Sequence, residues 1–408
     1  MRIELAAIAV CVASAAVADE APSFPAVVMQ AERSSPRLIE LAADVSAAEG
    51  HAQQAGAWPT PVLSLEREDF GGSGPYSGSS RAQTTVSISE PLEFAGQRGA
   101  RIDAGRAGVT AARARQMRLR AEFGFDLAVA YAAAEATQVR IDLLSEDLDR
   151  ANEDVRSARA LVEAGKEGEL RAVQAEAAAS AARADLEAAR ADGIAALTRL
   201  STLAGVVELY SRVAPSLLNF SRPPAVAAQP AETPSAPLVA SAQAERDSAE
   251  LLLTVERKRA IPTPAFTLGR RRYAEDDADA WVAGISIPLP LTDRNRGNIA
   301  AARAELSAAE ARLVAAHLEA AAGWRAATAE AAAAESRLAA SDQGEVSARE
   351  AYRLARIGYD AGRTPLFELL ATRRALTDAQ LRSLDARLAR VRSEAFLARL
   401  AGRIPFIE

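Results

Sequence analysis

The chain has 408 residues, of which 25% are charged and only 5% are aromatic, and alanine is visibly abundant. This length could supply two or three ordinary domains, but the composition is typical of long paired helices rather than of globular cores. A formal net charge of -6 at pH 7 argues against nucleic acid as a partner, because nucleic-acid binding needs a basic surface.

The first 18 residues have the layout of a cleavable secretory signal. Arg2 precedes an apolar run at residues 5–17, and small residues lie before the expected cleavage point at Asp19. Cleavage there would remove Cys11, the only cysteine, so we expect a mature protein without a thiol, a disulfide or a lipid anchor. No other run reaches the roughly 18 apolar residues of a membrane helix. An exported chain without a membrane helix is periplasmic, secreted or inserted into a membrane as β-strands.

The next predicted elements are a broken helix and two short strands. Residues 24–57 have a helical pattern that is interrupted at Ser35 and Pro36, where serine can cap a helix and proline can occupy its first position. Apolar and polar residues then alternate over residues 63–66 and 85–89, which predicts a pair of strands. The glycine-rich segment between them is predicted to be a flexible loop.

A very long helix follows these strands and dominates the sequence. No proline interrupts residues 99–162, and about 64 helical residues make a rod of roughly 95 Å, too long for one compact domain. Apolar residues recur at every seventh position, with a second row three residues further on, as in helices that pack together. A turn at residues 164–168 precedes a return helix at residues 169–203. The two rows consist of Leu127, Ala134, Ile141, Leu148, Val155 and Val162, and of Ala130, Leu144, Ala151 and Ala158.

The second half of the chain repeats the plan of the first. Six landmarks recur in one order, displaced by roughly 200 residues, which indicates a tandem duplication. We therefore expect a signal peptide at residues 1–18, a first structural repeat at 19–213, a proline-rich linker at 214–236 and a second repeat at 237–408. The landmarks include Ser35-Pro36 with Ala236-Pro237, Arg98-Gly99 with Arg296-Gly297, and Ala164-Gly165 with Ala361-Gly362.

The strands of the second repeat suggest contact with a membrane. Trp281, Ile285 and Ile287 belong to one alternating apolar face on a segment of about 10 residues, the length of a membrane barrel strand. A soluble hairpin with one wet face is the alternative, but two such pairs at equivalent positions of an exported chain favour the membrane. Four strands cannot enclose a polar lumen, so a barrel would have to be completed by oligomerisation.

Three stretches then resemble the TolC-like outer-membrane efflux channels, and within them the CzcC-type branch that serves heavy-metal efflux pumps. They are Ser35-Pro36-Arg37-Leu38, residues 91–98 and residues 287–298. The resemblance implies a homotrimer in which long helical hairpins form an α-barrel tunnel across the periplasm and four strands per chain contribute to a 12-strand transmembrane β-barrel. It also implies a periplasmic adaptor, an inner-membrane pump of the resistance-nodulation-division type, and outer-membrane lipid as partners.

The helix turns are the candidate functional positions under this resemblance, because they would lie at the periplasmic tip. We expect Thr364 to cap the following helix, Pro365 to occupy its first position, and glycine to suit the left-handed residue that ends a helix. A threefold axis would repeat each acidic tip residue as a ring that attracts cations. The candidate docking residues are Gly165, Gly168, Gly362, Thr364 and Pro365, and the candidate gate carboxylates are Asp360, which we favour, Glu163 and Glu169.

Residues for catalysis or for a bound cofactor are not evident. His51 and His317 lie far apart, and most carboxylates alternate with arginine along helices, as solvated faces do, so we expect no metal site, no cofactor and no enzyme. The predicted function is a passive outer-membrane channel for divalent heavy-metal cations. A channel for small organic compounds, a soluble periplasmic coiled-coil adaptor and a coiled-coil scaffold remain as alternatives.

Overall fold

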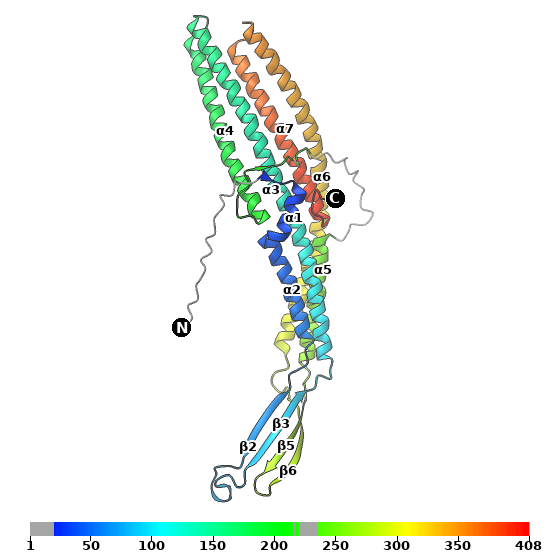
Figure 1. Ribbon diagram of the computed structural model, residues 1–408. Coiled ribbons are helices and arrows are strands. Elements are labelled where there is room, and N and C mark those ends of the chain that lie inside the picture. The colour runs from blue at the N-terminus through cyan, green and yellow to red at the C-terminus, as the bar shows by residue number, and fades with distance from the viewer. Residues whose placement is uncertain (1–19, 216, 220–235, 408) are drawn as a thin grey trace, which may run out of the picture. The chain divides into compact units, whose positions relative to one another are not determined.

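The computed structural model describes residues 20–215, 217–219 and 236–407, and these form seven α-helices and one four-stranded sheet, with a short two-stranded sheet beside them (Figure 1). The expected signal peptide lies outside the described residues, as does most of the proline-rich linker. The chain divides into two compact units. Unit 1 takes its described residues from 1–41, 118–236 and 320–408, and unit 2 from 42–117 and 237–319.

One pattern of elements occurs twice along the chain. In each half a helix precedes two strands, a long helix and a return helix, and the long helices contain 67 and 65 residues. The prediction of long helices joined by short turns is therefore confirmed. The helices are α1 (Phe24–Ser34), α2 (Pro36–Ala55), α3 (Gln97–Glu163), α4 (Glu169–Ala204), α5 (Pro237–Arg259), α6 (Arg296–Asp360) and α7 (Leu366–Leu400). The strands are β1 (Glu20–Ala21), β2 (Val62–Glu68), β3 (Gln83–Pro91), β4 (Arg212–Val213), β5 (Ala265–Tyr273) and β6 (Ala278–Ser286), and a 3-10 turn, η1 (Gly74–Tyr76), follows β2.

The seven-residue pattern of α3 corresponds to its buried side. Leu127 and Ala134 are buried, whereas Ile141, Leu148 and Val155 are half-buried. The second row is fully buried, and three of its members are alanines, which allow neighbouring helix backbones to approach closely. That row consists of Ala130, Leu144, Ala151 and Ala158.

Unit 1 has an aromatic core that the sequence patterns did not predict. The hydroxyl of Tyr131 donates to the carbonyls of Pro22 (2.9 Å) and Ala214 (2.7 Å), which lie beside the short parallel pair β1 and β4. Phe24 makes edge-on ring contacts with Tyr131 and with Phe406 of the C-terminal tail, at centroid distances of 5.7 and 6.2 Å. The residues around β1, the segment that precedes the linker and the C-terminal tail are thereby packed onto α1 and α3.

The sheet of unit 2 has the order β2-β3-β5-β6 and is antiparallel throughout. Both predicted strand pairs are present, and the pairing of β3 with β5 joins them into one sheet. Gly269 of β5 lies directly opposite Ser87 of β3, and a Cβ at Gly269 would lie 2.6 Å from the Cβ of Ser87. This position in the strand pair therefore requires glycine. The prediction that Ile287 belongs to a strand was wrong, because β6 ends at Ser286 and the following Pro288 cannot donate to a ladder.

Candidate functional site: a two-faced sheet and paired helix turns

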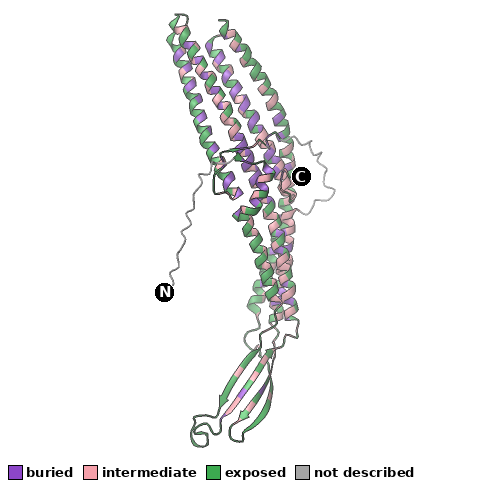
Figure 2. Cartoon of the chain, viewed as in Figure 1, coloured by how far each residue is buried: buried purple, intermediate pink, exposed green. Residues whose placement is uncertain are grey.

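One face of the four-stranded sheet carries large apolar side chains that none of the described residues covers. Leu63, Leu65, Trp281 and Ile285 are between 71% and 78% exposed, and Figure 2 shows the strands as mostly exposed. Residues directly opposite each other on neighbouring strands share a face, so these side chains lie in rows across the sheet. The two central rows consist of Leu63, Ile88, Leu268 and Ala283, and of Leu65, Val86, Arg270 and Trp281.

The opposite face of the sheet is polar and contains small side chains. Arg271 donates to the hydroxyl of Thr85 (2.9 Å) and to the amide oxygen of Gln83 (3.1 Å), and it forms an ion pair with Glu68 (3.1 Å). This network holds the arginine against the sheet surface. A sheet with one apolar and one polar face suits a position between lipid and water. The remaining polar-face positions include Ser64, Glu66, Ser87, Ser89, Thr267 and Gly284.

The turn between α3 and α4 has the backbone geometry expected at the end of a helix. Gly165 has a φ of +68°, and its N–H donates to the carbonyl of Val162 (2.9 Å). The N–H of Lys166 donates to the carbonyl of Leu161 (2.9 Å), which completes a Schellman motif. A Cβ at Gly165 would meet no atom within 4 Å, so glycine is needed there for its backbone conformation rather than for space.

The turn between α6 and α7 repeats this motif and corrects one prediction. Gly362 has a φ of +71°, and the N–H of Arg363 donates to the carbonyl of Gly358 (2.8 Å). Pro365, and not Thr364, occupies the N-cap position of α7, which has no side-chain cap hydrogen bond. The predicted threonine cap was wrong because the N–H of Thr364 also bonds to the carbonyl of Gly358 (3.1 Å), which keeps this residue in the preceding turn.

The predicted carboxylates lie at the helix ends next to these turns, which are at the same end of unit 1 (Figure 1). Glu163 ends α3, and Glu169 begins α4 directly after its N-cap residue Gly168. Asp360 ends α6 and pairs with Arg356 one turn earlier, with 3.3 Å between the carboxylate oxygen and the guanidinium Nε. All three carboxylates are exposed, so they can act on ions in the surrounding water.

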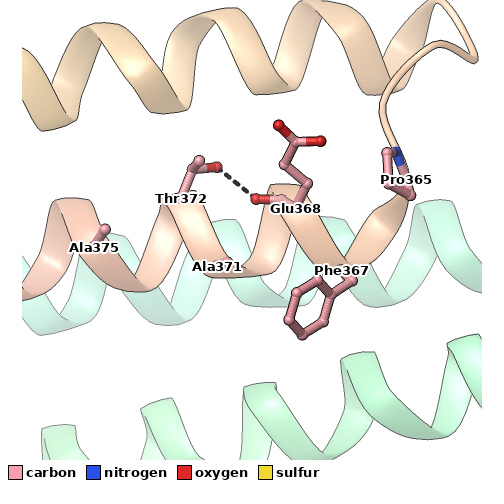
Figure 3. A pocket seen from close by; sticks show the side chains of 6 residues that line it. All are labelled: Pro365, Phe367, Glu368, Ala371, Thr372 and Ala375. Atoms are coloured by element: carbon pink, nitrogen blue, oxygen red, sulfur yellow. Dashed lines mark hydrogen bonds between the residues drawn. The ribbon is translucent and has the colours of Figure 1, made fainter.

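A shallow apolar groove runs along the first turns of α7, next to the second turn. Phe367 is 70% exposed beside it, and the hydroxyl of Thr372 bonds to the carbonyl of Glu368 (3.0 Å). Figure 3 shows these side chains along one helix. The lining residues are Pro365, Phe367, Glu368, Ala371, Thr372 and Ala375. Pro365 therefore belongs both to the predicted docking turn and to an exposed apolar surface.

A buried group of charged side chains in unit 1 was missed by the sequence patterns. Asp154 of α3 lies 3.2 Å from a terminal nitrogen of Arg356 on α6 and 3.3 Å from the Nε of Arg373 on α7. Arg373 also contacts Asp147, whose carboxylate accepts a hydrogen bond from the hydroxyl of Thr377 (2.7 Å). The alternating charges of the sequence indicate solvated faces for most carboxylates and do not single out these side chains. Three helices instead bring them together, and we call this group the buried ion cluster.

The environment of Asp154 changes its acidity. Burial raises the pKa of this carboxyl group from 3.8 to about 6, while the nearby Arg373 and Arg356 act to lower it. Burial also raises the pKa of the Tyr359 hydroxyl, which lies close enough to Glu167 and Asp154 to be affected by both. The cluster is therefore charged at neutral pH, and it takes up a proton at mildly acidic pH.

The described residues contain no group of three or more His, Cys, Asp or Glu side chains placed to hold a metal ion. Of the helices in the described part of the chain, none is both long enough and apolar enough to cross a membrane. The candidate functional features of the described residues are the two-faced sheet, the exposed turns and the buried ion cluster. These features define a protein built from long helical hairpins and a sheet with an uncovered apolar face.

Comparison with known proteins gives the family. The sequence profile of the outer membrane efflux proteins matches residues 27–206 and 233–403. The chain belongs to this family, which is not a family of enzymes, and membership places it among efflux components of the outer membrane. The resemblance to TolC-like channels is therefore confirmed.

Individual relatives show which branch of the family this chain is similar to. It is 44% identical over 392 residues to the nickel-cobalt-cadmium resistance protein NccC of Alcaligenes xylosoxydans xylosoxydans, covering 96% of this chain and 89% of that protein. It is 43% identical over 392 residues to the nickel and cobalt resistance protein CnrC of Cupriavidus metallidurans, covering 96% and 93%. Among solved structures, the CmeC outer membrane channel of Campylobacter jejuni has the same fold, with a TM-score of 0.80 at 16% identity over 94% of this chain and 87% of that one.

Proposed function

We propose that this protein is the outer-membrane channel of a tripartite efflux system and that it passively conducts divalent heavy-metal cations to the exterior. The observation that carries this proposal is the four-stranded sheet, whose apolar face suits lipid and whose polar face suits a water-filled lumen. The near full-length similarity to nickel and cobalt resistance proteins supports the choice of cargo.

The edges of the sheet support assembly into a trimer. β2 and β6 are edge strands, with no partner on their outer sides among the described strands. An exposed edge presents unpaired N–H and C=O groups, and such groups cannot remain unpaired in a membrane. If β6 of one chain pairs with β2 of the next, three chains supply three times four strands and close a barrel of 12. In this arrangement the polar faces surround the lumen.

The two helix turns support contact with a periplasmic adaptor, which in turn meets an inner-membrane pump. Each turn has an exposed basic residue directly after its left-handed glycine, Lys166 in the first and Arg363 in the second. Replacing Gly165 or Gly362 would strain a left-handed residue. A loss of adaptor binding in such a variant could therefore result from a distorted turn rather than from a lost contact. The sharper test is Lys166→Glu with Arg363→Glu, which should reduce chemical crosslinking to the adaptor and leave the yield of trimer unchanged. Undiminished crosslinking would move the docking site away from these turns.

Deletion of the gene tests the cargo. Cells that lack the chain should become more sensitive to nickel, cobalt and cadmium than to dyes or detergents, and expression of the intact chain should restore resistance. The opposite ranking would favour a channel for small organic compounds. Recovery of the chain as a soluble monomer, absent from outer-membrane fractions, would contradict the channel itself. A heat-sensitive trimer in those fractions is the expected result.

A further inference from the structure

The polar face of the four-stranded sheet contains charged side chains of both signs. Glu66 and Glu68 lie two residues apart on β2, and Arg271 lies on β5. Side chains alternate between the two faces along a strand, and directly opposite residues share a face, so these three belong to the same face. The other residues of this face on the four strands are uncharged. Two carboxylates and one guanidinium give the face a formal net charge of -1 per chain.

Contacts with two strands fix the guanidinium of Arg271 on this face. It pairs with Glu68 of β2 (3.1 Å) and donates to Thr85 (2.9 Å) and Gln83 (3.1 Å) of β3. The Arg271 side chain is 27% exposed, and Thr85 is only 5% exposed. The arginine therefore extends across β3 to the edge strand β2, and its charge is held at one place on the sheet rather than moving freely in water.

Glu66 differs from Glu68 in having no charged partner. It is exposed, and among the described residues no arginine or lysine forms an ion pair with its carboxylate, because Arg271 pairs with Glu68 instead. Glu66 lies in the same cross-strand row as Thr85 and Arg271, and two strand spacings place its backbone about 10 Å from that of Arg271. A fixed positive charge therefore opposes the field of an unpaired carboxylate close by.

We propose that Arg271 limits the attraction of the channel lumen for divalent cations, and that Glu66 supplies the attraction that Arg271 limits. The inference rests on the proposed function, in which the polar face of each sheet lines the lumen. Rings of charged side chains set the ion preference of channels, and an ion must be attracted strongly enough to enter but weakly enough to leave. In a trimer, each of these charges would occur once per chain around the lumen.

The valence of the ion decides how strongly this balance of charges acts. One unit charge about 10 Å away in water changes the local concentration of a monovalent cation by about twofold, and that of a divalent cation by about fourfold, because the electrostatic energy doubles with the charge of the ion. Loss of the Arg271 charge would therefore retain divalent cations more strongly than monovalent ones. A passive channel for divalent metal ions has to release them, and a fixed positive charge in the lumen favours release.

A purely structural role for Arg271 leads to a different expectation. If the residue only holds β5, β3 and β2 together, its hydrogen bonds matter and its charge does not. Lysine could not replace it in that role, because an ammonium group does not reproduce the fork of donors of a guanidinium. If the charge matters, Arg271→Lys should keep the ion preference of the unaltered chain, whereas Arg271→Gln should not.

Single-channel recordings of the purified chain in planar bilayers, at about 0.01 M salt, test the inference. Arg271→Gln should raise the ratio of K⁺ to Cl⁻ permeability by about two- to fourfold, and Glu66→Gln should lower it by a similar factor. The double variant should return the ratio to its original value, because its polar face again has a net charge of -1 per chain. Added NiCl₂ should reduce the K⁺ current of Arg271→Gln at a lower concentration than that of the unaltered chain, because Ni²⁺ is retained in the lumen.

The neighbouring Arg272 is the matched control. It is the next residue of β5 and lies on the opposite face of the sheet, with a side chain that is 63% exposed and paired with Asp277. Arg272→Gln should therefore change neither the permeability ratio nor the effect of NiCl₂. Equal shifts in Arg271→Gln and Arg272→Gln, or an Arg271→Lys variant that behaves like Arg271→Gln, would overturn the inference.

The same recordings separate this inference from the proposed function. If the unaltered chain forms no conducting channel, the proposed function itself fails. If the chain conducts but neither Arg271→Gln nor Glu66→Gln changes the permeability ratio, the channel stands and only the role of these two charges is refuted. A double variant that keeps the full shift of Arg271→Gln would refute the balance between Glu66 and Arg271.

Discussion

The helical region of unit 1 and the sheet of unit 2 place their polar and apolar groups in opposite ways. Unit 1 buries Asp154 completely and leaves Arg373 only 4% exposed, at the meeting of three helices. The sheet leaves Leu65 and Trp281 more than 70% exposed. A chain adapted only to water exposes its charged side chains and buries its large apolar ones. Each region is therefore organised for a requirement beyond its own stability.

Exposing apolar side chains and burying charged ones both cost free energy. The two regions differ in what would offset that free energy. The exposed apolar face of the sheet becomes favourable as soon as lipid covers it, so its arrangement indicates a solvent other than water. The charged groups of the buried ion cluster face one another instead, and proton uptake or separation of the helices would relieve the cost of their burial. Because Asp154, Arg356 and Arg373 belong to α3, α6 and α7, the cluster ties the first helical hairpin to the second. The predictions below test these two explanations.

The largest effect is expected from breaking the buried ion cluster. Arg373→Ala leaves Asp147 and Asp154 buried without their shared partner and should lower the free energy of unfolding by about 3–5 kcal/mol. The neighbouring Arg374 is the matched control, because its side chain is 62% exposed and its ion pairs are on the surface. Arg374→Ala should cost at most about 1 kcal/mol. Denaturant unfolding of both purified variants measures the difference, and equal losses would refute the special role of the cluster.

A smaller effect is expected from a charge on the apolar face of the sheet. Ile285→Arg should destabilise the membrane-inserted protein by about 2–4 kcal/mol near the midplane, because the guanidinium would enter lipid. Ser286→Arg, one residue further along β6, places the same charge on the polar face and should be tolerated. The yield of heat-resistant oligomer in outer-membrane fractions measures both variants. Equal yields would mean that the two faces do not have different surroundings.

The third effect is a dependence of stability on pH. Burial places the pKa of Asp154 at about 6 in the folded protein, above its ordinary value of 3.8. The folded state therefore binds the proton more tightly, so this group contributes stability that is fully present below pH 3.8 and is lost as the pH rises through 6. The charged neighbours are Arg373, Arg356, Glu153 and Asp147.

The measurement is the melting temperature of the protein and of Asp154→Asn between pH 4.5 and 7.5. The difference between the two melting temperatures should change across pH 6, because the amide does not titrate. A difference that stays constant over this range would show that Asp154 keeps an ordinary pKa. The arginines remain charged throughout, so they contribute no step of their own.

Local patterns in the sequence were sufficient for much of this fold. A proline-free run with a seven-residue repeat predicted α3, and a glycine at each helix end predicted the left-handed residues Gly165 and Gly362. These features depend on neighbours within one or two turns of helix. The alternation in β2 and β6 likewise predicted a sheet with one apolar face.

Features that depend on distant residues could not be predicted in this way. The pairing of β3 with β5 joins residues such as Ile88 and Leu268, and no local pattern specifies that register. The buried ion cluster was missed for the same reason. Asp154 and Arg373 lie next to the charged residues Glu153 and Arg374, so the local sequence does not distinguish them from solvated side chains, and only the packing of α3 against α6 and α7 removes them from water.

The smallest effect is expected at the exposed end of α6. Asp360→Asn removes one exposed carboxylate per chain, and in the proposed trimer it removes three from one ring. This should reduce the preference for cations over anions in single-channel recordings without lowering the yield of trimer. Asp360→Glu keeps the charge and serves as the control.

The salt dependence distinguishes a ring of charges from a structural effect. Asp360 is 59% exposed and lies 3.3 Å from Arg356, so its field is partly compensated and strongly screened by salt. The change in ion preference should therefore be clear at about 0.01 M salt, where the Debye length is about 30 Å, and nearly absent at about 1 M, where it is about 3 Å. A change that persists at high salt would mean that the substitution has altered the shape of the opening. Arg356 would then be implicated, because the loss of its exposed partner leaves Asp154 as its remaining carboxylate contact.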